Sequence, residues 1–488
     1  MTAAPTASGG QQEEAGGTDP GGEVGDIAIV LHSHMPYVEG FGTYPFGEEW
    51  LFDAFVRSHL PVLAVARDLT MTITPVLADQ LEDPAVAARM RDFVREFRVC
   101  SAELDAGDVE SELAPACHAE AERYRVALTE LERLGDDPLD AFRRAGGSGR
   151  VELMTSSATH AMLPLIATRE GRMLQLETAI RSHRRRFGPA DGIWLPECAY
   201  EPGLEHLLAE LGFSHFCTDQ SSRERSAAAL RPVATAAGTV AFTIDWEAVQ
   251  WLWSLTGYPS HPGYADFHAK SLRGCRPWAI SGAPYDPLVA GMRARKQATE
   301  FAVAAAERLQ RYREDTGRRG LLVFAIDTEL LGHWWWEGPA WLSAATEALP
   351  AAGVRMLKLG EALERHDPED RPLAATTWGE GKDRRTWDSP AVADLAWGMR
   401  RAELAVLREA SSGRLRGPAL ERAARELLAL QSSDWAFLDY GRKTGDYPFQ
   451  RALGHSLSLF EAIECGASTE PTLRGLAPDL TPAPLLEP

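Results

Sequence analysis

Short apolar runs that alternate with longer helical stretches constrain the fold of this chain more than any other feature of its sequence. From Asp26 onward each run is followed by a helical stretch or a long insertion, and the runs are 27–32, 71–77, 151–157, 192–197, 213–219, 239–245 and 321–327. Such runs indicate buried strands, and their alternation with helices indicates parallel strands joined by crossover helices. The pattern predicts an α/β fold, either a barrel or an open doubly wound sheet.

Other segments depart from this alternation. Residues 80–134 are charged, Ala-rich and helical in period, which predicts a helical insertion in an α/β part that spans 26–387. A C-terminal helical domain is expected over 388–466, because three long helical stretches follow Asp388 without a convincing strand, at 390–410, 417–432 and 446–464. The Gly-rich, acidic residues 1–25 predict a disordered tail. The Pro-rich residues 467–488 are expected to trail in solvent.

The charge balance narrows the possible partners. Fifty Lys and Arg residues face 70 Asp and Glu residues, and the formal charge of -20 repels nucleic acid and anionic lipid surfaces. No run of about 20 apolar residues could span a membrane, the first residues do not resemble a signal peptide, and the six cysteines are scattered, as reduced thiols are. We expect a cytoplasmic protein with a neutral partner, no nucleic acid and no membrane. Its 14 Trp residues suit a flat ligand.

Two carboxylates stand at the ends of predicted strands, where barrels and open α/β sheets bind their ligands. Glu197 lies in the segment WLPEC, and Asp327 closes the run LLVFAID. Such a pair can act as nucleophile and general acid/base in glycosyl transfer, or each residue can be a helix N-cap or an ion-pair partner. The structural role is less favoured for Asp327, because three successive Trp residues, 334–336, follow it and rarely all enter one core.

Histidines follow the first predicted strand. His32 and His34 point to the same side, because side chains alternate along a strand. This spacing suits a metal ion, and it also suits two donors that hold sugar hydroxyls. His160 is either a satisfied core histidine or a ligand contact. Among the tryptophans, Trp378 stands out because Gly and charged residues surround it and disfavour deep burial.

These segments, in this order, resemble the five signature regions of glycoside hydrolase family 57. They are 32–37 (HSHMPY), 152–160, 194–200 (WLPECAY), 327–338 and the region from 376 (TTWG) onward. The similarity is closest to the 1,4-α-glucan branching enzymes and spans about residues 27–466. The segments 257–259 (GYP) and 431–435 (QSSDW) also look like branching-enzyme segments.

The resemblance implies an incomplete (β/α)7 barrel, a C-terminal all-helical domain, an α-glucan polysaccharide as substrate, and neither a metal nor an organic cofactor. It implies a retaining double displacement with Glu197 as the nucleophile and Asp327 as the general acid/base. The substrate-binding residues that it implies are His32, His34, His160, Trp253, Gly257, Trp378, Trp387 and Asp434. The enzyme would cleave an α-1,4 bond and pass the chain fragment to a 6-hydroxyl.

The sequence departs from the family pattern in two places. Branching enzymes of this family usually present a loop Tyr after the nucleophile strand, but residues 217–241 contain no aromatic residue. The usual Arg-Asp of the next strand is replaced by Ile244-Asp245. Both departures bear on how well water is excluded, and therefore on transfer against hydrolysis.

Three alternatives stay open at this level. An α-amylase or a 4-α-glucanotransferase would use the same chemistry. A metal-dependent polysaccharide deacetylase would instead use His32, His34 and an Asp as zinc ligands. A glucan-binding protein without catalysis would keep the aromatic rings, but the presence of both carboxylates argues against it.

Overall fold

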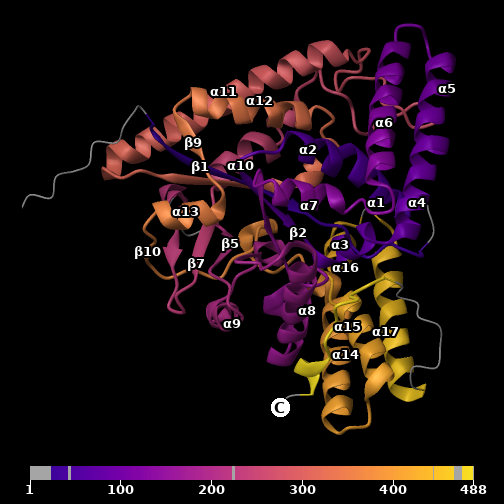
Figure 1. Ribbon diagram of the computed structural model, residues 1–488, viewed down its shortest axis with the longest axis vertical. Coiled ribbons are helices and arrows are strands. Elements are labelled where there is room, and N and C mark those ends of the chain that lie inside the picture. Colours follow the sequence, from indigo (N-terminus) through magenta and orange to yellow (C-terminus); the bar gives the residue numbers. More distant parts are fainter. Residues whose placement is uncertain (1–22, 42–45, 222–225, 443, 466–474, 487–488) are drawn as a thin grey trace, which may run out of the picture.

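The computed structural model describes residues 23–41, 46–221, 226–442, 444–465 and 475–486 (Figure 1). All of the apolar runs that the sequence predicts as strands are confirmed, and short strands at 233–234, 354–356 and 369–370 add to them. The strands are β1 Gly25–Ser33, β2 Leu69–Ile73, β3 Val151–Met154, β4 Gly192–Trp194, β5 His215–Asp219, β6 Val233–Ala234, β7 Val240–Ile244, β8 Leu321–Asp327, β9 Val354–Met356 and β10 Glu369–Asp370.

The strands form two sheets whose principal pairings are parallel, as predicted. One sheet has the order β3-β2-β1-β8, with β9 also on β1, and the other has the order β10-β6-β7-β5-β4, in which only the β6–β7 pair is antiparallel among the described pairs. The sheets meet at two seams. Trp194 N donates to Thr155 O at 2.9 Å beside β3 and β4, and Asp245 N donates to Val323 O at 2.8 Å between β7 and β8.

Strand register brings polar residues together at the carboxyl ends of the strands. In the pairing of β1 with its neighbours, His32 lies opposite Thr72 of β2 and opposite Asp327 of β8. Glu197 follows β4 after two residues. Since all residues of β1 are buried, this strand forms the centre of the core, and the end of the strand delivers its histidine to the sheet edge.

Helices surround the sheets. They are α1 Glu48–Ala54, α2 Leu60–Val65, α3 Pro75–Leu81, α4 Pro84–Asp92, α5 Cys100–Asp108, α6 Ala114–Leu134, α7 Asp140–Gly147, α8 Arg169–Phe187, α9 Leu204–Glu210, α10 Trp246–Trp253, α11 Pro287–Thr316, α12 Gly338–Ala351 and α13 Leu359–Arg365. The longest, α11, begins with an Asp286 side chain that accepts hydrogen bonds from two backbone amides, and it ends at Gly317 in the left-handed conformation. Its Phe301 packs on Phe324 of β8 and Trp341 of α12.

The helical character predicted for residues 80–134 is confirmed. Helices α4, α5 and α6 stand together as a long projection beside the sheets (Figure 1). Its inner side is tied to the core by Arg57, whose guanidinium pairs with Glu120 of α6 and lies over the ring of Trp336.

The C-terminal segment is helical, as predicted. It consists of α14 Ala393–Ser411, α15 Gly417–Leu430, α16 Ser433–Gly441 and α17 Tyr447–Cys465, of which the sequence did not predict α16 as a separate helix. These helices gather next to α8 at one end of the molecule (Figure 1). Their apolar cluster includes Tyr37, Val76 and Leu174 of the α/β part, so the two parts share buried surface.

The expectation that residues 467–488 trail in solvent is wrong for the part that the structure describes. Leu476 and Leu485 are buried, and Ala477 N donates to Asp79 Oδ2 at 2.7 Å. The apolar side chains of this segment remove surface from water, and the ion pair between Arg185 and Asp479 adds to the attachment. The predicted tail over 1–25 lies outside the described residues up to residue 22, and β1 begins at Gly25.

Among the described helices, none combines the length and the apolar character that crossing a bilayer requires. The six cysteines are all free thiols.

Candidate active site

A cavity of about 350 Å³ lies at the carboxyl ends of the strands, and the C-terminal helices close part of its wall. Of the residues predicted to form the site, those that line the cavity are His32, His34, His160, Glu197, Trp253, Asp327, Trp378, Trp387 and Asp434. Further lining comes from Trp50, Trp246, Glu329, Trp334, Gly379, Phe437 and Leu438. The structure therefore brings both predicted carboxylates and a set of aromatic rings into one space.

Glu197 is held by two donors. Ser433 Oγ donates to Oε1 at 2.7 Å, and Trp378 Nε1 donates to Oε2 at 3.0 Å. The Glu197 backbone is in the left-handed region at φ 59° and ψ 20°, which costs a non-glycine residue about 1 kcal/mol. The hydrogen bond from Trp378 N to Glu197 O at 3.0 Å holds it there. Backbone strain of this kind is concentrated at functional sites.

Burial raises the pKa of Glu197 to about 7, although its hydrogen bonds from Ser433 and Trp378 oppose the shift. Burial also raises the pKa of Asp327 well above its ordinary value, and the nearby Glu329 and Glu197 carboxylates add to this shift. Among the described residues, none donates a hydrogen bond to the Asp327 carboxylate. Two neighbouring carboxylates do not ionise together easily. Glu197, which has two donors, therefore keeps the negative charge, and Asp327 keeps the proton.

Three histidines stack in the cavity wall. The ring centroids of His34 and His160 are 4.1 Å apart, and those of His32 and His160 are 4.9 Å apart. His32 also stacks on Trp194 of β4. Burial lowers the pKa of both His32 and His160 well below the ordinary value, and the other histidines nearby add to the effect. These two rings are therefore neutral at neutral pH.

Asp434 reaches the site from α16. Its Oδ2 lies 2.9 Å from His34 Nε2 and 2.5 Å from Ser432 Oγ, which donates to it. Burial alone would raise the pKa of Asp434, but the neighbouring His34 and His160 lower it to about 2. Asp434 is thus a permanent negative charge, and the helical domain supplies a charged side chain to a cavity at the end of the sheets.

One group of side chains has the spacing of a metal site. His34, His160 and Asp434 offer ligand atoms that all lie within 4.8 Å of one another. However, both nitrogens of each ring already have partners: His34 bonds Thr74 and Asp434, and His160 bonds His32 and Ser433. The rings are also stacked face to face, so their in-plane lone pairs run side by side instead of converging on one point. This arrangement fits a hydrogen-bonded wall better than a metal centre.

The aromatic rings differ in their exposure. Trp253 is 46% exposed and meets Trp334, which is 37% exposed, edge to face at one rim of the cavity. Trp387 lines the cavity but is only 2% exposed, because it packs in one buried apolar cluster with Met162, Leu165 and Ala199. Phe437 lies over it with ring centroids 6.5 Å apart. Phe437 is the more accessible ring of this pair. Trp387 can therefore offer a substrate only the edge of its ring, and not the face that the predicted stacking role requires.

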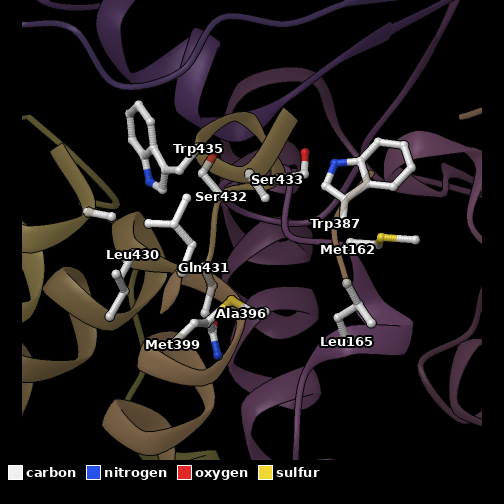
Figure 2. A pocket seen from close by; sticks show the side chains of 13 residues that line it. Met162, Leu165, Trp387, Ala396, Met399, Leu430, Gln431, Ser432, Ser433 and Trp435 are labelled. Carbon is white, nitrogen blue, oxygen red and sulfur yellow. The ribbon is translucent and has the colours of Figure 1, made fainter. Parts of the chain in front are cut away.

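A smaller pocket lies behind Trp387. Figure 2 shows Trp387, Met162 and Leu165 on one side of it and Ser433 and Trp435 on the other. The pocket lies between the α/β part and the C-terminal helices, next to the hydrogen bond from Ser433 to Glu197. The helical domain therefore packs directly against the wall of the candidate active site.

Gly257, which the resemblance assigns to substrate binding, does not line the cavity. It begins the short helical turn Tyr258–Ser260, and a Cβ added to Gly257 would lie 2.2 Å from the carbonyl oxygen of Leu252. The glycine is needed for the close approach of two backbone segments, so the structure explains it by packing behind Trp253.

Asp245, at the end of β7, has a structural role. Its side chain caps α10 by accepting from Ala248 N, and it forms a buried ion pair with Arg308 of α11 at 2.6 Å. Asp245 therefore does not line the cavity. The next residue, Trp246, does line the cavity, and Lys382 Nζ lies 3.3 Å from the centre of its ring.

The segment from 217 to 241 gives the cavity no ring. Its described residues include the turn Ser226–Leu230, which Arg308 holds through hydrogen bonds to Ser226. None of the described residues of this segment lines the cavity. The prediction that an aromatic lid is missing is consistent with this arrangement.

Sequence reasoning missed several residues of the site. Ser433 donates to Glu197, Thr72 bonds His32, and Glu329 accepts from His59 Nε2 at 2.6 Å. Ser433 lies inside the segment QSSDW that the resemblance singled out, so its neighbour Asp434 was a signal for it. Thr72 lies inside an ordinary strand, and no sequence pattern marks it.

Comparisons with known proteins agree with this geometry. The model of "Glycosyl hydrolase family 57" matches residues 28–374, and that of "1,4-alpha-glucan branching enzyme, C-terminal" matches residues 396–476. The chain belongs to glycosyl hydrolase family 57.

Several relatives within family 57 are similar along almost their whole length. A probable 1,4-α-glucan branching enzyme of Mycobacterium tuberculosis is 33% identical over an alignment that covers 93% of this chain and 94% of that protein. The crystal structure of a branching enzyme of this family from Pyrococcus horikoshii has a TM-score of 0.87 at 29% identity and covers 95% of this chain and 97% of that one. One from Thermococcus kodakaraensis, solved with glucose, has a TM-score of 0.87 at 28% identity, with the same coverage.

Proposed function

We propose that this protein is a 1,4-α-glucan branching enzyme that works by a retaining double displacement. The observation that carries the proposal is the pair of carboxylates in one aromatic-lined cavity. Glu197 has two hydrogen-bond donors, and Asp327 has none among the residues that the structure describes. The branching-enzyme names of its relatives and the match of residues 396–476 support the reaction type.

The proposed chemistry assigns a separate task to each carboxylate. Glu197 attacks the anomeric carbon of the donor glucan, while Asp327 gives its proton to the glycosidic oxygen and the α-1,4 bond breaks. Asp327 then takes the proton of an acceptor 6-hydroxyl, whose oxygen attacks the same carbon and releases Glu197. The charge on Glu197 and the proton on Asp327 are the starting states that this sequence needs.

The proposed scaffold is an incomplete (β/α)7 barrel. From β8 the strands follow one another through β1, β2, β3, β4 and β5 to β7, which touches β8 again at the second seam. Two weak seams, each supported by single bonds instead of a full ladder, are what an interrupted barrel would have.

The proposed substrate contacts follow from the cavity walls. His32, His34 and His160 would face the hydroxyls of the donor sugar, with Asp434 as an acceptor. Trp253 and Trp378 would stack on glucose rings, since flat apolar faces suit the C–H faces of sugars. Gly257, which was also predicted to contact substrate, would affect binding only indirectly, by allowing its backbone to pack closely against Leu252.

We predict that activity needs no metal ion. The ring nitrogens of His34 and His160 all have protein hydrogen-bond partners, so a metal would have to break bonds that already stabilise the wall. Dialysis against a strong chelator should leave the rate of amylose conversion unchanged, and metal analysis should find no stoichiometric zinc. Loss of activity that zinc alone restores would instead favour the deacetylase alternative.

An α-amylase is the second candidate function, because the described part of 217–241 brings no ring to the cavity. The glycosyl-enzyme on Glu197 can be released by water or by a 6-hydroxyl, and transfer wins when the acceptor is well positioned and water is kept out. We predict that hydrolysis is a larger side reaction here than in relatives with the loop Tyr.

This prediction is tested by counting new reducing ends and new α-1,6 linkages on the same amylose. We expect both products, with branches forming at a rate that exceeds the background without enzyme. Branching with almost no reducing ends would show that another element excludes water. Reducing ends without any branches would make the protein an amylase.

A further inference from the structure

A row of hydrogen bonds leads away from the candidate nucleophile into the protein. Ser433 Oγ lies 2.7 Å from Glu197 Oε1 and 2.9 Å from His160 Nδ1. The Nε2 atoms of His160 and His32 are 3.0 Å apart, and His32 Nδ1 lies 2.6 Å from Thr72 Oγ1. All five residues are buried. The row crosses from α16 of the helical domain through the ends of β4, β3 and β1 to β2.

The direction of every bond in this row follows from the charge on Glu197. A carboxylate only accepts, so Ser433 donates its single proton to it and must accept from His160 Nδ1–H. His160 is neutral, which leaves its Nε2 bare to accept from His32 Nε2–H. His32 is neutral in turn, so its Nδ1 accepts from the hydroxyl of Thr72. The four bonds form a one-way chain that ends on Glu197.

We propose that Ser433 is a positioning residue that, with this one-way chain behind it, keeps Glu197 ionised for attack. The inference deepens the proposed function, because it assigns a new role within the same reaction. It also gives the C-terminal helical domain a part in the chemistry, since Ser433 is the first residue of α16 and its backbone N donates to His160 O at 3.2 Å.

The chain resists protonation of Glu197 at Oε1. A protonated Oε1 is a far weaker acceptor for Ser433, so the bond would weaken, break or reverse. After reversal the Ser433 proton would need another acceptor. If that acceptor is His160 Nδ1, both histidines exchange tautomers and His32 donates to Thr72. Buried polar groups that lose a partner are costly, so the intact chain favours the carboxylate form.

Other groups around Glu197 act on the same proton equilibrium. The titratable and charged groups that face it are Asp327 from β8, Asp434 from α16, and His34 and His160 from the ends of β1 and β3. Asp434 is charged and opposes the charge on Glu197, whereas His34 favours it. The donors Ser433 and Trp378 act in the same direction as His34 and offset the repulsion by Asp434.

The first test is the pH profile of kcat/KM, whose acid limb reports the ionisation of the nucleophile in the free enzyme. Removing one hydrogen bond to a buried carboxylate in Ser433→Ala should move this limb up by about one pH unit and lower kcat/KM at pH 6 by about tenfold. Ser433→Thr keeps a hydroxyl and should restore most of the shift. An acid limb that stays in place in Ser433→Ala would overturn the inference.

Two further variants separate the chain from a single local bond. Thr72→Val removes the far end of the chain, four bonds from Glu197, and should move the acid limb in the same direction by a smaller amount. Ser432→Ala removes the neighbouring hydroxyl, whose partner is Asp434, and should leave the acid limb in place. A Thr72→Val profile that matches the wild type would show that no chain operates.

The second test does not depend on activity. Neutron diffraction from deuterated crystals locates protons directly, and it should show deuterium on His160 Nδ1 and on His32 Nε2, with none on His160 Nε2. Deuterium on His160 Nε2 would overturn the one-way chain. If the enzyme makes no branches, the acid limb can be measured from reducing ends, and if it cleaves no glucan at all, the proposed function fails while the neutron map still decides the chain.

Discussion

Glu197→Gln should lower the rate of amylose conversion by about a thousandfold or more, which corresponds to about 4 kcal/mol of activation free energy. The amide cannot form the glycosyl-enzyme, because it lacks the negative charge and the nucleophilicity of the carboxylate. Its size is nearly that of Glu, and it can keep one acceptor oxygen for Ser433 or Trp378. The measurement is the initial rate of iodine-stained amylose loss together with the thermal unfolding midpoint, which should change little.

Glu201 provides a matched control for this variant. It follows Glu197 by four residues but pairs with Arg172 and Arg384 outside the cavity. Glu201→Gln should keep most of the activity. Wild-type rates in the Glu197→Gln enzyme would show that Glu197 is not the nucleophile.

Asp327→Asn should cause a loss of similar size on amylose, because the leaving glucan chain then receives no proton. The effect should depend on the leaving group. A glycosyl fluoride, such as α-maltosyl fluoride, leaves without protonation, so the first step with this substrate should be slowed far less than with amylose. The comparison of both substrates with one variant separates a general acid from a residue that only binds the glucan.

Asp245 offers the contrast for Asp327, because both residues end a strand. Asp245 is tied to Arg308 and to the first turn of α10, so Asp245→Asn should act on stability and equally on both substrates. If Asp327→Asn slows amylose and the fluoride equally, the assignment of Asp327 as general acid fails.

The strands were predictable because their signal is local. The run 321–327 has an uninterrupted apolar sequence, and it becomes a strand whose first six residues are buried. The order of the strands was not predictable in this way. A parallel pairing such as β1 with β8 joins segments almost 300 residues apart. Neither segment contains a sequence signal that identifies its partner.

The catalytic pair was predictable in part for the same reason. Glu197 and Asp327 stand at strand ends, a position that parallel sheets reserve for ligands. Gly257 illustrates the limit, because its segment suggested substrate binding and the structure shows a close backbone contact with Leu252. Trp387 is a second case, since its ring is buried by residues far away in the sequence, Met162, Leu165 and Ala199.

The last described segment, 475–486, shows why composition alone can mispredict exposure to solvent. Residues 475–486 are Pro-rich and were expected in solvent, yet Leu476 and Leu485 are buried. Composition describes how a segment behaves when it has no partner. The helical domain and α8 supply the apolar surface and the charges that hold it.

By itself the sequence determined the α/β character of residues 26–387, the helical C-terminal domain and the two carboxylates at strand ends, because periodicity and strand-end position are properties of neighbouring residues. Only the tertiary structure decided which donors hold Glu197, which carboxylate keeps its proton, and which rings reach the cavity. The bond from Ser433 to Glu197 spans 236 residues. Such a contact exists only when two parts of the chain pack together, and the electrostatic environment that separates the two carboxylates arises from the same packing.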